Sequence, residues 1–79
     1  MKRKLIFDEP GLQAFAQRLK TVRRAKNLTQ EELAAKSGLT LSQIARIETA
    51  RTNPTLSTIF RIIRTMEIKP SELFDFELP

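Results

Sequence analysis

Apolar residues recur at helical spacing along most of this 79-residue chain. Between residues 11 and 26 they return every three or four positions, with polar residues between them, which predicts a helix with one buried face. Asn27 then ends this helix, because asparagine tolerates the left-handed conformation that closes a helix C-terminus. The apolar face consists of Leu12, Phe15, Leu19 and Val22.

Two short helices follow, and each begins with a capping box. Thr29 with Glu32, and Thr40 with Gln43, have the spacing at which a hydroxyl and a longer polar side chain satisfy each other's backbone N–H groups. Each pair therefore marks a helix N-terminus. The predicted helices run from Gln30 to about Ser37, where Gly38 ends the first, and from Leu41 to about Thr49.

Two further helices complete the predicted fold. The segment from Leu56 to about Met66 has a broad apolar face and begins after Thr55, a good N-cap. Pro70 opens a last turn or two that reaches Phe74. The one strand candidate, residues 4–7, is better explained as part of a flexible basic arm. The sequence thus predicts an all-α fold, with an N-terminal arm at 1–10 and one domain at 11–79.

The chain contains no cysteine and no histidine. This composition excludes disulfides, thiolate nucleophiles and zinc-finger ligand sets, and it removes the commonest general base. We therefore expect no enzyme activity, no metal and no cofactor. No stretch of apolar residues is long enough to cross a membrane. A cytoplasmic location is expected, because nothing in the sequence needs an oxidising compartment.

The net charge of +5 is unevenly distributed. Residues 1–30 carry eight Lys or Arg against two acids, whereas residues 65–79 carry one Lys against four acids. The basic part suits a polyanion such as DNA, RNA or an anionic membrane. A solvated charged surface is the alternative, and charge alone does not decide between the two.

Seven positions between Gln30 and Ile47 have the residue types that a helix-turn-helix requires. Ala34 is small where the two helices cross, and Gly38 stands where the turn needs a positive φ. The other positions start the unit or point into the shared core, and together they indicate a helix-turn-helix at about residues 29–49. A generic helical hairpin is the alternative. The core positions are Leu33, Leu39, Ile44 and Ile47.

Several segments resemble the phage repressor and Cro type of helix-turn-helix, also called the XRE family. This resemblance extends from about Phe15 to Phe74 and implies a compact, lambda-repressor-like domain of five helices. It also implies a dimeric transcriptional regulator, usually a repressor, that inserts the second helix of each unit into a major groove of operator DNA. The matching segments are Leu28–Ala34, Ser37–Thr40, Ile44–Glu48, Asn53–Leu56 and Pro70–Phe74.

The resemblance also implies roles for individual residues in DNA binding. The base-reading positions are Leu41, Ser42 and Arg46, and the guanidinium of Arg46 can grip guanine with two hydrogen bonds. The alternatives for Arg46 are a phosphate contact or a pair with an acid. Leu41 departs from the polar residue common there, and either packs on a thymine methyl or contributes little. The expected phosphate contacts are Gln30, Gln43, Arg51, Thr52 and Asn53.

The same resemblance implies roles for three further positions. Arg23 and Glu48 match a buried ion pair between the first and third helices, which we interpret as structural. Ala50 stands where a glycine is common, so we expect a small strain there if φ is positive. A hydrophobic patch is expected to form the dimer interface, with ordinary core packing as the alternative. Its residues are Phe60, Ile63, Phe74, Phe76 and Leu78.

The biological setting stays open between three kinds of regulator. A phage-type repressor, a controller of a restriction-modification operon and the antitoxin of a toxin–antitoxin pair all fit a short chain of this type. The expected partners are double-stranded DNA, a second copy of the chain and, for an antitoxin, a toxin protein. The alternative function is a protein-interaction module, such as a toxin-neutralising subunit, with little salt-dependent affinity for DNA.

Overall fold

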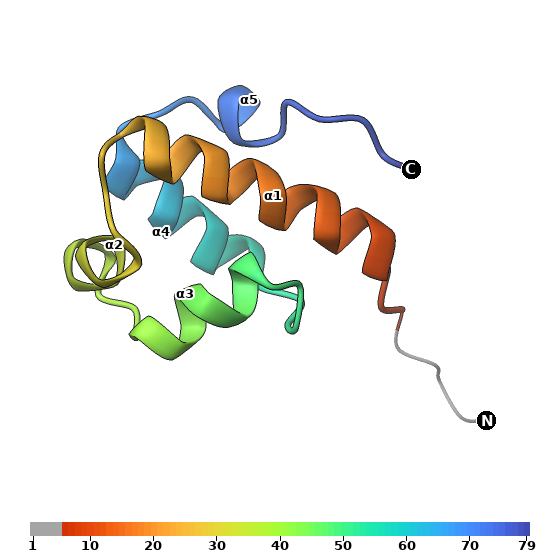
Figure 1. Cartoon of the computed structure of the whole chain (residues 1–79), viewed down its shortest axis with the longest axis horizontal. Helices are drawn as coiled ribbons and strands as arrows, with labels where there is room; N and C mark the ends of the chain where they lie inside the picture. The colour runs from red at the N-terminus through yellow and green to blue at the C-terminus, as the bar shows by residue number, and fades with distance from the viewer. Residues whose placement is uncertain (1–5) are drawn as a thin grey trace.

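The computed structural model describes residues 6–79 and contains five α-helices and no strand among them (Figure 1). The prediction of an all-α, five-helix fold is confirmed. In Figure 1, α1 crosses the molecule, with α5 and the C-terminal segment along one side of it and α2 and α3 on the other. The helices are α1 (Glu9–Ala25), α2 (Gln30–Ser37), α3 (Leu41–Glu48), α4 (Leu56–Met66) and α5 (Pro70–Leu73).

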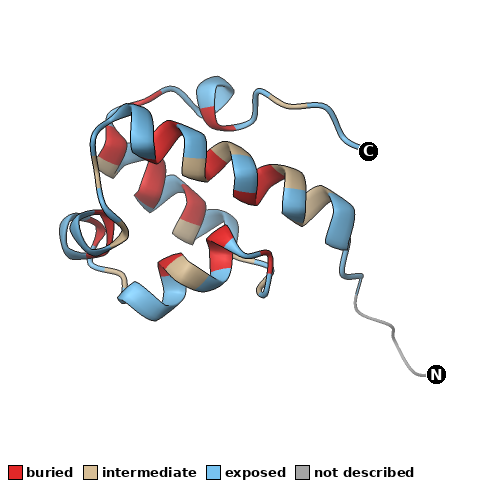
Figure 2. Cartoon of the chain, in the orientation of Figure 1, coloured by how far each residue is buried: buried red, intermediate tan, exposed pale blue. Residues whose placement is uncertain are grey.

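Every helix contributes one large, fully buried side chain to a single core. Figure 2 shows the buried residues on the faces that the helices turn toward one another. α2 and α3 pack together as the helix-turn-helix, α1 packs on α3, and α4 packs on α2. Burial of these apolar side chains is the main force that holds the short helices in place. The five residues are Leu19, Leu33, Ile44, Ile62 and Leu73.

The first helix begins two residues earlier than the apolar pattern indicated. The carboxylate of Asp8 accepts a hydrogen bond from the Gly11 N–H at 3.1 Å and so caps the helix. Pro10 is tolerated because the first turn has N–H groups without helical partners in any case. The helix ends at Ala25, one residue before the predicted Lys26.

Both predicted capping boxes are present. In α2 the Thr29 hydroxyl accepts from the Glu32 N–H at 3.0 Å, and the Glu32 carboxylate accepts from the Thr29 N–H at 3.0 Å. In α3 the corresponding bonds between Thr40 and Gln43 are 3.0 and 2.8 Å long. α2 has the predicted bounds, and α3 ends at Glu48, one residue before Thr49.

The four longer helices all end in a Schellman motif, in which one residue adopts a left-handed conformation. In each, the N–H after that residue donates to a carbonyl five positions back, at 2.9 to 3.3 Å. Only Gly38 is a glycine, so the other three residues carry the strain of a positive φ. The expected strain at Ala50 is therefore present, with φ of 56°. The left-handed residues are Asn27, Gly38, Ala50 and Glu67.

The two ends of the chain differ slightly from the prediction. α5 is one turn and stops at Leu73, one residue before Phe74. Lys69 supplies no side-chain cap, and its N–H instead donates to the Glu72 carboxylate at 3.3 Å. Of the predicted arm at 1–10, residues 9 and 10 belong to α1, and 6–8 have no regular structure. Residues 1–5 lie outside the described part of the chain, as does part of the strand candidate at 4–7.

Candidate nucleic-acid interface

One face of α3 is turned to solvent, as a DNA-reading helix requires. Ile44 and Ile47 are buried against the core, whereas Leu41, Ser42 and Arg46 are exposed. Leu41 is 44% exposed, so its side chain is available for contact. Arg46 takes part in none of the ion pairs formed within residues 6–79, so its guanidinium is free to meet a ligand.

Beside this face, α3, the loop after it and the start of α4 enclose a polar hollow of about 300 Å³. It gathers four of the residues predicted to contact DNA, although two come from α3 and two from the loop. We call it the polar hollow. Its polar lining residues are Gln43, Arg46, Thr52, Asn53, Thr55 and Thr58.

Thr55 and Thr58 were not predicted as site residues. The sequence identified Thr55 only as a helix cap, and the structure shows that role: its hydroxyl accepts from the Thr58 N–H at 3.2 Å. The side-chain hydroxyls of the two threonines are also 3.2 Å apart. The only feature of the sequence that pointed to them was a pair of hydroxyl residues three positions apart, at the start of α4.

The remaining predicted DNA contacts lie outside the polar hollow. Leu41 and Ser42 are on the first turn of α3. Arg51 is exposed and comes directly after the Schellman motif that ends this helix, where its backbone N–H donates to the Arg46 carbonyl at 2.9 Å.

Gln43 lines the polar hollow, and its side-chain oxygen accepts a hydrogen bond from the Thr40 N–H. Only the amide N–H groups of Gln43 therefore remain to donate to a phosphate.

The predicted pair of Arg23 and Glu48 forms a buried, two-pronged ion pair. The Arg23 Nε and Nη2 groups donate to the two carboxylate oxygens of Glu48 at 2.6 and 2.9 Å. Arg23 Nη1 donates to the carbonyl of Leu28 at 2.8 Å and so ties down the loop before α2. The hydrogen bonds to Glu48 raise the pKa of the Arg23 guanidinium above its ordinary value.

The side chain of Gln30, the first residue of α2, makes a hydrogen bond within the fold. Its side-chain nitrogen Nε2 donates to Glu48 Oε1 at 2.9 Å, and the residue is half-buried. The bond joins the first residue of α2 to the last residue of α3. Nothing in the sequence indicated this contact, because the two residues are eighteen positions apart.

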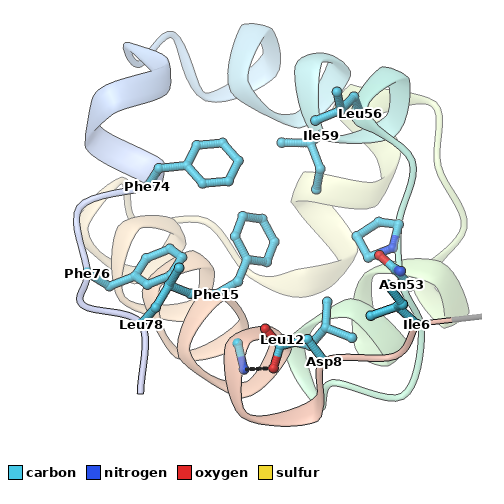
Figure 3. A pocket seen from close by; sticks show the side chains of 12 residues that line it. Ile6, Asp8, Leu12, Phe15, Asn53, Leu56, Ile59, Phe74, Phe76 and Leu78 are labelled. Carbon is cyan, nitrogen blue, oxygen red and sulfur yellow. Dashed lines mark hydrogen bonds between the residues drawn. The ribbon is translucent and has the colours of Figure 1, made fainter.

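An apolar groove of about 480 Å³ runs between α1, the start of α4 and the C-terminal segment (Figure 3). Phe15 forms its floor, and its ring centre lies 5.4 Å from that of Phe74 and 6.3 Å from that of Phe76. Such tilted aromatic contacts are stabilising. We call it the apolar groove. Its main lining residues are Leu12, Phe15, Leu56, Phe74, Phe76 and Leu78.

The residues of the predicted dimer patch do not form one surface in the structure, so the prediction of a single patch is wrong. Ile63 is 5% exposed and belongs to the core, so it is not available to a partner. Phe60 is 43% exposed but lines a different hollow, beside Arg61 and Arg64. Successive helix positions point about 100° apart, so Phe60 and its neighbour Ile59 face different surroundings. Of the predicted patch, only Phe74, Phe76 and Leu78 line one surface.

Within residues 6–79, no helix combines the length and the apolar character needed to cross a membrane. The same residues contain no group of three or more acidic, histidine or cysteine side chains placed to hold a metal ion.

Residues 19–73 match the family model described as helix-turn-helix. The immunity repressor protein of Bacillus phage phi105 is 40% identical over 57 residues, which are 72% of this chain and 40% of the repressor. The restriction-modification controller protein C.AhdI from Aeromonas hydrophila has 41% identity and a TM-score of 0.77 over 80% of this chain and 96% of its own. Both are named as regulators, and neither is named as an enzyme.

A third similar protein has been solved as a tetramer with its natural 35 base-pair operator. This controller protein, C.Esp1396I, shares 31% sequence identity with the chain, with a TM-score of 0.75. The match covers 81% of this chain and 84% of the controller.

Proposed function

Because this chain belongs to the helix-turn-helix family, we propose that it binds double-stranded operator DNA as a homodimer and regulates transcription, as a repressor. The observation that carries the proposal is the polar hollow. It brings Gln43 and Arg46 of α3 together with Thr52 and Asn53 of the following loop, on the side where α3 is exposed. Amide, hydroxyl and guanidinium donors on one surface suit a DNA backbone and the base edges beside it.

Three exposed residues of α3 are proposed to read bases. Arg46 donates to guanine O6 and N7, because its guanidinium is exposed and no carboxylate of the described residues competes for it. Ser42, one helical turn earlier, donates or accepts at several bases and so discriminates weakly. Leu41 packs on a thymine methyl, which would explain why a leucine is left exposed there.

The proposed phosphate contacts surround this reading surface. Gln43, Thr52 and Asn53 line the polar hollow, and we add Thr55 and Thr58 because their hydroxyls line it as well. Arg51 follows directly after α3 and is exposed. Gln30 supplies a contact at the other end of the unit, from the N-terminus of α2, where backbone N–H groups favour an anion.

A second copy of the chain is proposed to cover the apolar groove. Leu56 is 64% exposed, Leu78 is 72% exposed and Phe74 is 45% exposed, which leaves apolar side chains in water on a small domain. Asn53 and Pro54 line both the groove and the polar hollow. A copy seated there would therefore place its own reading helix on the same side of the assembly, as two adjacent half-sites require.

The setting we favour is the control of a restriction-modification operon. C.AhdI and C.Esp1396I, both named as restriction-modification controllers, share this fold with TM-scores of 0.77 and 0.75 at 41% and 31% sequence identity. As such a regulator, the helix-turn-helix domain at 11–79 would have no enzyme activity and would work in the cytoplasm. The genes beside its own decide this setting: a restriction enzyme supports it, and a toxin or prophage gene contradicts it.

Titration of labelled upstream DNA at two salt concentrations tests the proposed function. We expect affinity that falls steeply with salt, because phosphate contacts release counterions. Arg46→Ala should weaken specific binding by about 1–3 kcal/mol and relax the preference at one base pair. Arg64→Ala is the matched control, since it removes the same charge from an exposed residue outside the polar hollow.

Each part of the proposal has its own contradicting result. An Arg46→Ala variant that discriminates sequences as the parent does would show that Arg46 does not read bases. A parent chain whose DNA affinity is weak and insensitive to salt would contradict DNA binding itself. It would instead favour a protein-interaction module.

A further inference from the structure

Glu48 receives more hydrogen bonds than its ion pair requires. Its side chain is fully buried, and Arg23 already supplies two charged donors, one to each carboxylate oxygen. Gln30 adds a third donor at 2.9 Å, to Oε1. Arg23 is buried, but Gln30 is only half-buried and stands at the first residue of α2. The third bond therefore reaches from the core to the surface of the helix-turn-helix.

The charge of Glu48 fixes which way the Gln30 amide is turned. An ionised carboxylate only accepts hydrogen bonds, so the amide must direct its nitrogen, and not its oxygen, toward Glu48. One N–H of Nε2 is then committed to Glu48, while the second N–H remains available. A free glutamine samples many rotamers and loses that freedom when it binds. Here the contact with Glu48 removes most of the freedom before any ligand arrives.

We infer that Glu48 is a positioning residue for DNA binding, which holds Gln30 so that its second N–H meets a DNA phosphate. This inference rests on the proposed function. Glu48 itself touches no DNA, because it is buried. Through Arg23 and Leu28 the same carboxylate also fixes the loop that leads into α2. One buried group thus sets the place of a phosphate contact on α2 and the end of the reading helix α3.

A double-mutant cycle in DNA affinity tests the inference. The probe is a duplex selected by the parent chain from random sequences. Gln30→Ala should weaken binding roughly ten- to a hundredfold, the usual range for one hydrogen bond to a charged group. Glu48→Asp keeps the charge for Arg23 but withdraws the carboxylate from Gln30. It should cause a similar loss, and the double variant should lose no more than either single variant.

A stability control separates positioning from folding. Ile63→Val removes one core methylene and lowers stability without touching Glu48 or its partners. It should leave DNA affinity unchanged under conditions in which all variants are folded. If Ile63→Val weakens binding as much as Glu48→Asp does, the loss reflects stability and the inference is wrong. The inference is also wrong if the losses of Gln30→Ala and Glu48→Asp multiply.

A second measurement needs no Glu48 variant and decides the matter if Glu48→Asp is unfolded. In the parent chain, the two side-chain N–H protons of Gln30 are followed by NMR as the selected duplex is added. The proton that is hydrogen-bonded to Glu48 should keep its chemical shift, and the chemical shift of the other proton should change as it meets the phosphate. Movement of neither or of both protons would overturn the inference. A parent chain that selects no duplex would contradict the proposed function instead.

Discussion

The polar hollow and the apolar groove meet at the same short loop, yet they are built in opposite ways. Asn53 and Pro54 line both. Side chains around the hollow are held by helix caps and hydrogen bonds, as with Gln43 on the Thr40 N–H. Those around the groove are held by contacts between rings, as with Phe15 and Phe74. Directional bonds thus hold the surface that we propose for DNA, whereas non-directional burial holds the surface that we propose for a second copy.

The largest expected effect comes from breaking the buried ion pair between Arg23 and Glu48. Arg23→Met leaves the carboxylate of Glu48 buried without its charged partner, which should lower the free energy of unfolding by about 3 kcal/mol. Urea denaturation measures this loss. Arg24→Met is the matched control, because its neighbouring guanidinium is exposed, and it should change stability little. If both variants change the free energy of unfolding equally little, the ion pair between Arg23 and Glu48 does not stabilise the fold.

A charge placed in the apolar groove should separate assembly from folding. Leu78→Glu sets a carboxylate on an exposed groove residue, so the monomer should remain folded while dimerisation weakens by about 2 kcal/mol. Sedimentation velocity at several concentrations measures the change. Phe60→Glu is the control and should leave the dimer intact. If Phe60→Glu dissociates the dimer and Leu78→Glu does not, the second copy sits on the face of Phe60 and not on the groove.

The two surfaces were not equally predictable from the sequence. Helices α2 and α3 have nearly the bounds expected, because a capping box is complete within four residues. The core followed from apolar spacing for the same local reason. The Gln30–Glu48 bond could not be predicted, because it depends on how α2 and α3 cross. The cap at Asp8 was not predicted, because the apolar pattern that indicated α1 begins only at Leu12.

The apolar groove was harder to predict than the polar hollow, for a physical reason. Ile63 and Phe60 both read as apolar residues of α4, and spacing alone does not say which neighbour covers which part of a broad apolar face. Contact of Phe74 and Phe76 with Phe15 joins residues about sixty positions apart. Such packing is a property of the whole fold, whereas the residues of the polar hollow that were predicted to contact DNA, Gln43, Arg46, Thr52 and Asn53, come from one helix and the loop after it.

A smaller effect is expected where α3 ends, just before the loop that both surfaces share. Ala50 has φ of 56°, a conformation that costs less for glycine. Ala50→Gly should therefore stabilise the domain by roughly 0.5–1 kcal/mol, measured as a higher thermal midpoint. Glu67→Gly, at the matching position after α4, should give a similar gain. A loss at Ala50 alone would show that its methyl group is needed where it is buried beside the loop.

The smallest expected effect is that of pH on stability, which should differ between the capping boxes of α2 and α3. The backbone N–H of Thr29 and then its hydroxyl hold the pKa of the Glu32 carboxylate below its ordinary value. Because the folded pKa is the lower one, the stabilisation is complete above the ordinary pKa and disappears as pH falls through the folded value. In α3, the same place is taken by Gln43, which does not titrate in this range. Acid should therefore loosen the start of α2 and leave that of α3 unchanged.

Glu32→Gln tests this contrast, since it copies the box of α3 into α2. The variant should lose the part of the acid dependence that Glu32 causes, while it remains close to the parent in stability at neutral pH. Urea denaturation of both chains above and below the ordinary pKa of glutamate measures the difference. An unchanged acid dependence would assign it to other carboxylates. The start of α3 should not respond to acid in either chain, because the bond from the Thr40 N–H to the Gln43 side-chain oxygen involves no titrating group.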